Sequence, residues 1–271
     1  MNRHQVSRAG HLVRVGLFDH PGGQPHVDPM EETAEGWSVN LVCTGSFRID
    51  NRHTPYVVGP HSVFVTHPGM VYRCRHDEDY PTDVCLTVDV APELALEALG
   101  REQSRLPPVR PLSNRLGYLR FKLEKNLRAD VSDLLLDEIA LELLRSVAGV
   151  ADLERNVYDT HSLTWYARRV DRVRDVLESD YSSPHPLADL ARLSGISPFH
   201  LARVFREMVG VPPHRFLVQT RLAAAARFLR EGRPVSETAL ACGFANLSHF
   251  VRAFSRHYGV SPGRYSRLRG P

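Results

Sequence analysis

The sequence predicts an α+β protein in which a β-rich first half is followed by an all-helical second half. Short alternating segments between Gly and Pro turns fill residues 11–90, whereas helical periodicity dominates from residue 113 onward. The charge is divided in the same way. Residues 161–271 contain 17 arginines against eight acidic residues, a net charge of +9, while residues 1–160 carry a net −6. A basic half of this kind is typical of a nucleic-acid-binding domain.

The chain has 271 residues, 42% hydrophobic and 24% charged, which suits two globular domains of ordinary size. We expect a first domain over residues 1–155, a linker over 156–162 and a second domain over 163–271. No apolar run approaches the roughly 18 residues of a membrane span, and we expect neither a membrane segment nor a signal peptide. The four cysteines form no CxxC pair, which predicts reduced thiols in a cytoplasmic protein.

Seven short strands are expected in the first half, at residues 11–18, 37–43, 46–50, 56–58, 62–66, 71–75 and 84–90. Many short strands with Gly and Pro turns between them favour a small antiparallel barrel or sandwich. Helices are expected to follow at residues 92–99, 113–127 and 131–150. The last of these is apolar on more than one face, which favours packing on the barrel and against a second copy in a homodimer. The alternative is a core helix of a single chain.

The second half contains the same pattern twice, at residues 187–216 and 235–265. Each copy predicts a short helix, a glycine turn at Gly195 or Gly243, and a second helix. Ser197 is expected to cap the second helix of the first copy. Two short helices joined by a tight turn form a helix-turn-helix, which places its second helix in the major groove of DNA.

The second helix of each copy has a buried face and an exposed face. We expect the buried faces to contain Leu201, Val204, Phe205 and Met208 in the first copy, and Phe250, Ala253 and Phe254 in the second. The exposed faces are expected to carry Phe199, Ala202, Arg203 and Arg206, and then Ser248, His249, Arg252 and Ser255, with Asn246 as the second cap. A helix over residues 213–229 would hold the two units apart, so that they reach successive major grooves about 34 Å apart.

This repeated segment resembles the paired helix-turn-helix domain of the AraC/XylS family of bacterial transcription regulators, over residues 163–269. The resemblance is carried by Gly195, Gly243 and the runs Phe-Val-Arg-Ala-Phe at 250–254 and Gly-Val-Ser-Pro-Gly-Arg-Tyr at 259–265. It implies base-reading positions at Phe199, Ala202, Arg203, Leu247, Ser248 and Arg252. Further DNA-binding candidates on the same helices are His200, Arg206, Asn246, His249 and Arg256. Ala202 and Leu247 can make only apolar contacts, for example to a thymine methyl group.

Residues 59–72 resemble, more loosely, the cupin-like sensor barrel that precedes this kind of DNA-binding domain. A barrel of this size has room for one small ligand, so the resemblance implies a small-molecule effector. The candidate effector-binding residues are Trp37, Tyr56, His67, Tyr72 and Arg73, because pockets combine apolar walls with a few polar groups.

Cupin enzymes hold a metal with histidines on adjacent strands, and this set is broken here. The first pair would be His26 and Asp28, and no histidine follows the Pro-Gly turn at 68–69, where Met70, Val71 and Tyr72 stand. We therefore expect no metal, no other cofactor and no catalytic residue. The further histidines His61, His67 and His76 are expected to lie in loops or in the pocket.

The leading hypothesis is a regulator, favoured by the resemblance to be an activator, that binds double-stranded promoter DNA and responds to a small-molecule effector. The resemblance also implies RNA polymerase as a partner, a homodimer, and a cytoplasmic bacterial protein associated with the nucleoid when bound. One alternative is a metal-dependent cupin enzyme, a dioxygenase or isomerase, fused to a DNA-binding tail. The other is a ligand-independent regulator controlled by a protein partner or by its own abundance.

Overall fold

The computed structural model describes residues 3–20, 31–51, 54–76, 79–80, 82–100, 106–127, 129, 132–149 and 157–267. The chain divides into two compact units, residues 1–164 and 165–271. The division falls two residues beyond the linker predicted at 156–162, of which only residue 156 lies outside the described residues and residues 160–162 are already helical. His26 and Asp28, the pair considered for a metal, also lie outside them.

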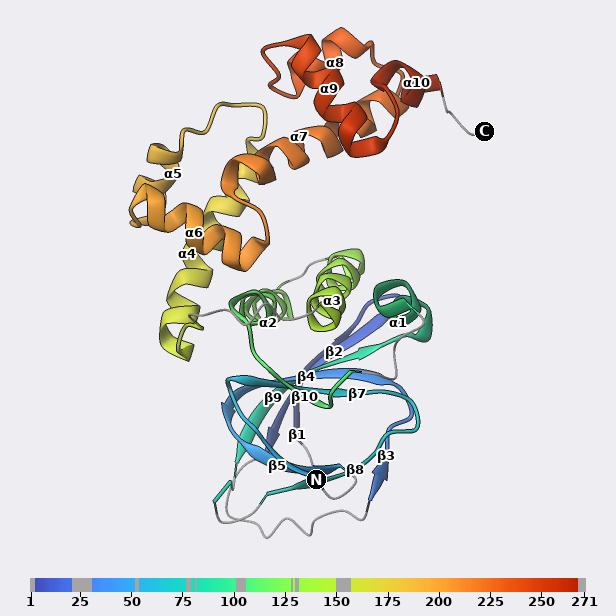
Figure 1. Cartoon of the computed structure of the whole chain (residues 1–271), viewed down its shortest axis with the longest axis vertical. Helices are drawn as coiled ribbons and strands as arrows, with labels where there is room; N and C mark the ends of the chain where they lie inside the picture. The colour runs from blue at the N-terminus through green and yellow to red at the C-terminus, as the bar shows by residue number, and fades with distance from the viewer. Residues whose placement is uncertain are drawn as a thin grey trace. The chain divides into compact units, whose positions relative to one another are not determined.

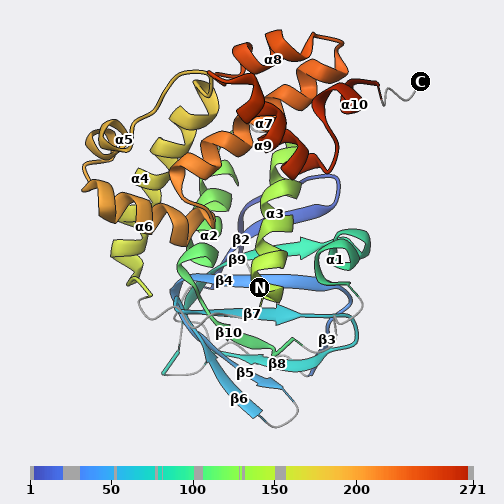
Figure 2. The ribbon, with the colours of Figure 1, turned by 45° about the horizontal axis from the view of Figure 1, so that its top comes forward.

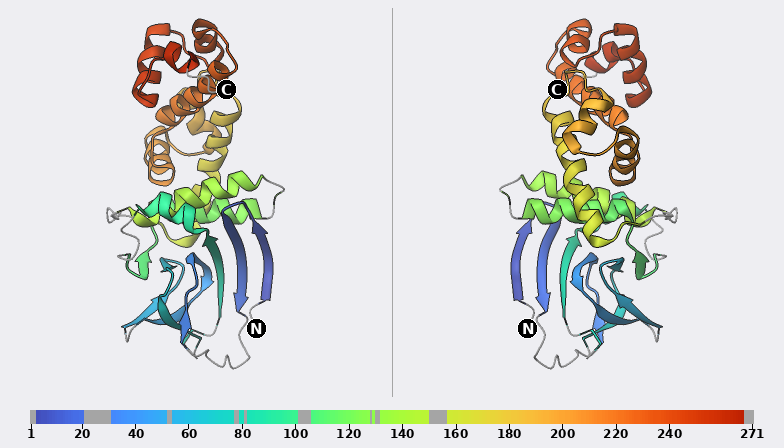
Figure 3. Two further views of the ribbon diagram at one scale, coloured as in Figure 1. Left: turned by 90° about the vertical axis from the view of Figure 1, so that its right-hand side faces the viewer. Right: turned by 90° about the vertical axis from the view of Figure 1, so that its left-hand side faces the viewer.

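The first unit contains two antiparallel sheets (Figure 1). The six-stranded sheet has the order β1-β2-β9-β4-β7-β10, with β1 and β2 at one edge (Figure 3), and the four-stranded sheet has the order β3-β8-β5-β6. The strands are β1 (Arg3–Ala9), β2 (Val13–His20), β3 (Glu32–Thr33), β4 (Trp37–Gly45), β5 (Phe47–Asn51), β6 (Thr54–Val58), β7 (Ser62–Thr66), β8 (Val71–Arg75), β9 (Asp83–Val90) and β10 (Val109–Pro111).

Three of these strands, β1, β3 and β10, were not predicted, and the predicted barrel is not closed. Within the described residues, no strand of one sheet is hydrogen-bonded to a strand of the other. Alternating side chains predict two-faced strands, but they do not determine whether the edge strands pair with each other. Strand patterning therefore did not distinguish a closed barrel from a sandwich. The structure has two separate facing sheets.

The alternation along each strand separates two sets of side chains. On β9, Leu86, Val88 and Val90 face the helices and belong to the larger apolar core. Their neighbours Asp83, Cys85, Thr87 and Asp89 line the space between the sheets. Successive side chains of a strand point to opposite faces, so the same strand serves both the helical core and the inner cavity.

Three helices cover one face of the six-stranded sheet: α1 (Pro92–Leu99), α2 (Asn114–Leu127) and α3 (Asp133–Ala148). Figure 2 shows α2 and α3 side by side over β2, β9 and β4. On α3, Leu136, Leu143 and Leu144 are fully buried, while Leu134 is 62% exposed. Packing within the unit therefore accounts for most of the apolar surface of α3, and the predicted dimer stays a prediction. The predicted helix ends, Val131 and Val150, lie outside the described residues.

The second unit is helical. Its elements are α4 (Thr160–Ser179), which begins in the first unit, α5 (Leu187–Ser194), α6 (Pro198–Val209), α7 (Pro213–Arg230), α8 (Val235–Ala241), α9 (Leu247–Tyr258) and α10 (Pro262–Arg267). Helices α5 and α6 form one helix-turn-helix and α8 and α9 the other, joined by α7 (Figure 1). With 18 residues at about 1.5 Å each, α7 is about 27 Å long. Within the described residues, no helix combines the length and the hydropathy needed to cross a membrane.

Both predicted glycine turns are present, with φ angles of 65° at Gly195 and 75° at Gly243. Asn246 caps α9 as expected, since its side chain accepts a hydrogen bond from the His249 N–H at 3.0 Å. The cap prediction for Ser197 is only half right. Ser197 stands at the N-cap position with extended backbone, but its hydroxyl makes no capping hydrogen bond. The fixed φ of Pro198 at the first position of α6 favours the helix start instead.

Candidate nucleic-acid interface and inner cavity

Helix α6 presents an aromatic ring and two arginines to solvent. Its opposite face is fully buried, with Leu201, Val204, Phe205 and Met208 all 0% exposed. This burial fixes the rotation of the helix, and Phe199 is consequently 83% exposed, with Arg203 and Arg206 exposed beside it. These three side chains lie at i, i+4 and i+7, which is one stripe of a helix.

The remaining predicted residues of α6 are less accessible. His200 is half-buried, with its ring centroid 5.2 Å from that of Tyr166. Ala202 is half-buried and lines a hollow of about 320 Å³ within the second unit. Arg203 lies 3.5 Å from His200 Nε2 and 4.0 Å from a Glu207 carboxylate oxygen. An exposed ion pair of this length contributes about 0–1 kcal/mol, so a phosphate or a base can displace it.

Helix α9 has the more basic exposed surface. Its buried face consists of Phe250 and Phe254, both 0% exposed, and the helix contains no acidic residue. The side chains exposed to solvent are Leu247, Ser248, His249, Arg252, Arg256 and His257. Within the described residues, no acidic side chain lies within ion-pair distance of Arg206, Arg252 or Arg256. Their full charge is available to a polyanion.

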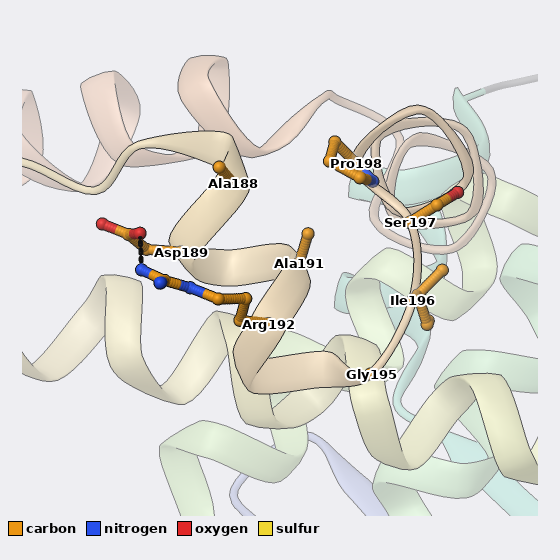
Figure 4. A pocket seen from close by; sticks show the side chains of 8 residues that line it. All are labelled: Ala188, Asp189, Ala191, Arg192, Gly195, Ile196, Ser197 and Pro198. Carbon is orange, nitrogen blue, oxygen red and sulfur yellow. Dashed lines mark hydrogen bonds and ion pairs between the residues drawn. The ribbon is translucent and has the colours of Figure 1, made fainter.

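A shallow hollow lies beside the first turn, between α5 and the start of α6 (Figure 4). Its lining residues are Ala188, Asp189, Ala191, Arg192, Gly195, Ile196, Ser197 and Pro198. Arg192 forms an ion pair with Asp189 at its side. That pairing neutralises Arg192, so the unpaired positive charge near this turn comes from α6.

The two helix-turn-helix units are held together by more than α7. Arg221 of α7 donates hydrogen bonds to the backbone oxygens of Tyr181 at 2.7 Å and Ser183 at 2.9 Å, in the loop before α5. Gly243, in the turn of the second unit, packs against the Ser182 backbone of the same loop. The Arg221 guanidinium also lies 5.9 Å from the Phe244 ring centroid. The loop therefore ties the first helix-turn-helix to the second, which fixes the orientation of α6 relative to α9.

A cavity of about 270 Å³ lies between the two sheets of the first unit. It is lined by Phe18, His20, Glu32, Ser38, Asn40, Phe47, Ile49, Phe64, Tyr72, Cys74, His76, Asp83, Cys85, Thr87 and Asp89. This lining includes three acidic side chains and neither a lysine nor an arginine. Among the predicted effector-binding residues, Tyr72 lines the cavity, and its hydroxyl donates a hydrogen bond to Glu32 at 2.9 Å.

The other four predicted effector-binding residues do not line this cavity. Trp37 is 5% exposed and lies on the opposite, helix-facing side of the sheet, because it shares the parity of Val39 and Leu41 along β4. Its ring centroid lies 5.8 Å from that of His67. Tyr56 and Arg73 are half-buried on β6 and β8.

The structure also brings together His20, His76 and Asp83, which the sequence analysis did not group. Asp83 is 2% exposed, and its Oδ1 lies 2.6 Å from His76 Nε2 and 2.9 Å from His20 Nδ1. Burial raises the pKa of Asp83, but the hydrogen bonds from His20 and His76 outweigh it, so the pKa lies below its usual range. The signal for this cluster is the pairing of His20 with Asp83 across β2 and β9, which requires the strand register.

Known proteins and a family model match the helical region of this chain. Residues 190–268 match a family model described as a helix-turn-helix domain. The HTH-type transcriptional activator AarP of Providencia stuartii is 32% identical over 90 residues, which cover 33% of this chain and 67% of AarP. A solved structure of a probable AraC family transcriptional regulator from Rhodopseudomonas palustris is 30% identical and covers 38% of this chain and 99% of that one, with a TM-score of 0.36.

The chain belongs to the AraC family. The matched region of this AraC-family chain runs from α5 through α10, the two helix-turn-helix units described above. A further relative, the probable transcriptional regulator LumQ of Photobacterium leiognathi, is 32% identical over 104 residues, which cover 36% of this chain and 42% of LumQ. The chain therefore spans less than half the length of this relative.

Proposed function

We propose that this protein is a sequence-specific transcription regulator that binds double-stranded promoter DNA through α6 and α9. The observation that carries the proposal is the pair of exposed helix faces bearing Arg203, Arg206, Arg252 and Arg256, each on a helix anchored by a fully buried opposite face. Arginine at such positions can read guanine through two hydrogen bonds, or contact phosphates. The net charge of +9 in residues 161–271 supplies the long-range attraction to DNA.

Each predicted contact has a distinct role in this proposal. Arg203 and Arg252 occupy corresponding positions in the two copies and would read base edges. Phe199 and Leu247, both exposed, would make apolar contacts such as those to a thymine methyl group. Ser248 and His249 would complete the second site, while His200, Ala202 and Arg206 flank the first.

The regulatory half of the proposal rests on the inner cavity. We propose that an effector occupies the cavity between the sheets and shifts the protein between two states for which it has different affinities. Activation is the favoured outcome, as the relative AarP is a transcriptional activator, with RNA polymerase as the partner. We also propose that the protein acts as a homodimer in the bacterial cytoplasm, where the promoter DNA is, and performs no catalysis of its own.

The proposal is tested by selecting binding sites from a random DNA library with the full-length protein. The selected duplex and a scrambled duplex are then titrated at two salt concentrations. We expect selective binding that weakens steeply with salt, because counterions are released at each neutralised phosphate. Arg203→Ala and Arg252→Ala should each weaken specific binding by about 1–3 kcal/mol and relax the preference at one base pair.

Arg172→Ala is the matched control, since it removes the same charge from an exposed position on α4, outside both recognition helices. Equal losses in all three variants, on selected and scrambled DNA alike, would reduce the arginines to general electrostatic attraction. Failure to enrich any sequence would refute sequence-specific binding.

A further inference from the structure

Two imidazoles and one carboxylate converge at one end of the inner cavity. His20 Nδ1 lies 2.9 Å and His76 Nε2 lies 2.6 Å from the same oxygen, Asp83 Oδ1. The ring centroids of His20 and His76 are 4.7 Å apart, and the potential ligand atoms of all three residues lie within 4.8 Å of one another. The three side chains are 17%, 4% and 1% exposed, respectively.

The fold positions these side chains from three strands and both sheets. His20 is the last residue of β2 and Asp83 the first residue of β9, and the two are paired directly in the ladder. His76 directly follows β8, in the four-stranded sheet. The cluster therefore lies where the two sheets meet, and it is built on regular strands whose register fixes the spacing of its side chains.

We propose that His20, His76 and Asp83 bind a divalent first-row transition-metal ion, of which Zn²⁺ is the reference case. Two imidazole nitrogens and one carboxylate oxygen form a common protein ligand set for such ions. Bond lengths of about 2.0–2.2 Å place tetrahedral ligand atoms roughly 3.4 Å apart. The present spacings of 2.6 and 2.9 Å are shorter than this, so an ion would be accommodated by moving the side chains apart by less than about 1 Å.

The charge around the cluster favours a cation. Asp83 Oδ2 is buried and, within the described part of the chain, accepts no hydrogen bond, so one oxygen remains available as a ligand. Glu32 and Asp89 also line the cavity, whose lining residues include no basic side chain apart from the two histidines. An anionic ligand would meet this negative potential unfavourably, whereas a divalent ion reduces it.

This site differs from the broken cupin set of His26, Asp28 and the position after the Pro-Gly turn. It uses His76, which the sequence analysis expected to be a loop or pocket histidine, and the proposal departs from the expectation of no metal. Three protein ligands leave at least one coordination position for water or a small molecule in the adjoining cavity. An ion held from β2, β9 and β8 would also link the two sheets. The metal site rests on the geometry of the first unit alone and does not depend on the proposed function.

The test is a titration of the metal-free, full-length protein with ZnCl₂ against a chromophoric chelator, without DNA. We expect one tightly bound Zn²⁺ per chain. Asp83→Asn and His76→Gln should each weaken it by more than about 100-fold, because even the loss of an outer-shell partner costs about 10–100-fold in metal affinity. His61→Asn is the matched control, as His61 is exposed and does not line the cavity, and its affinity should equal that of the wild type.

Replacing Zn²⁺ with Co²⁺ in the wild-type protein gives a readout that needs no variant. Visible absorption of a four- or five-coordinate Co²⁺ ion supports the site, even if Asp83→Asn fails to fold. A spectrum of hexaaqua Co²⁺, or Zn²⁺ binding that survives both substitutions, would overturn it and leave the three side chains as a hydrogen-bonded network. DNA is absent from these titrations, so their outcome is independent of the DNA-binding experiment.

Discussion

Replacing Gly243 with alanine is expected to destabilise the second helix-turn-helix unit much more than the same change at Gly195 destabilises the first. Both residues have positive φ, 75° and 65°, where an L-residue costs about 1–2 kcal/mol. At Gly195 nothing lies within 4 Å of the added Cβ. At Gly243 the Cβ would overlap the backbone oxygen of Ser182 and lie 2.8 Å from its carbonyl carbon.

The overlap at Gly243 is with backbone, so the loop around Ser182 must move to relieve it. Arg221 holds that loop through two hydrogen bonds, and a hydrogen bond to a charged group contributes about 1.5–3 kcal/mol. Alanine also lowers the entropy of the unfolded chain, which stabilises the folded state by about 0.4–1 kcal/mol at either site and partly offsets the loss. We therefore expect a loss of about 1 kcal/mol for Gly195→Ala and about 3 kcal/mol or more for Gly243→Ala.

The assay is urea denaturation of the full-length variants with hydrogen exchange measured on peptides from α6 and α9. Gly243→Ala should lower the protection of α9 first, while Gly195→Ala leaves α9 at the wild-type level. Equal, small losses of stability in the two variants would refute the packing of Gly243 against Ser182. They would also refute the connection between the two helix-turn-helices.

Three further predictions, two substitutions and one labelling experiment, concern other parts of the second unit. Phe199→Ala should leave the free energy of unfolding from urea denaturation within about 0.5 kcal/mol of the wild type, because the ring is 83% exposed, yet weaken binding to the selected duplex; wild-type affinity would remove Phe199 from the interface. Arg221→Met removes the hydrogen bonds to Tyr181 and Ser183 and should lower the free energy of unfolding in urea by about 1.5–3 kcal/mol or more. It should also weaken binding to a full site, which both helix-turn-helices contact, more than binding to a half-site. Burial raises the pKa of Cys242 to about 11, so at pH 8 its thiolate population should be about 100-fold below that of an ordinary thiol; rapid iodoacetamide labelling of the folded protein, read by mass spectrometry, would contradict this.

The helical half could be predicted well because its signals are local. The burial of Leu201, Phe205, Phe250 and Phe254 follows from helical spacing alone, and both glycine turns were found at the expected positions. The Asn246 cap was also predicted correctly. The connection between the two helix-turn-helices was not predicted, because Arg221 contacts a loop 38 to 40 residues away in the sequence. No periodic pattern indicates such a contact.

The first unit was harder to predict because its site depends on strand register. Alternation along β4 predicts that Trp37 and Asn40 point to opposite faces of the sheet. Sequence alone does not say which of these faces packs against the helices. The inner cavity therefore has Asn40 rather than Trp37 in its wall. His20 and Asp83 meet only because β2 pairs with β9.

The most direct test of the account inserts base pairs between the two halves of a selected binding site. Two recognition helices held at a fixed separation, about one helical turn apart, should tolerate neither an insertion of about 5 base pairs nor one of about 10. We predict that both insertions reduce the affinity to that of a half-site. Full affinity after the insertion of about 10 base pairs would show that the units move freely, and unchanged affinity after both would show that only one unit reads the DNA.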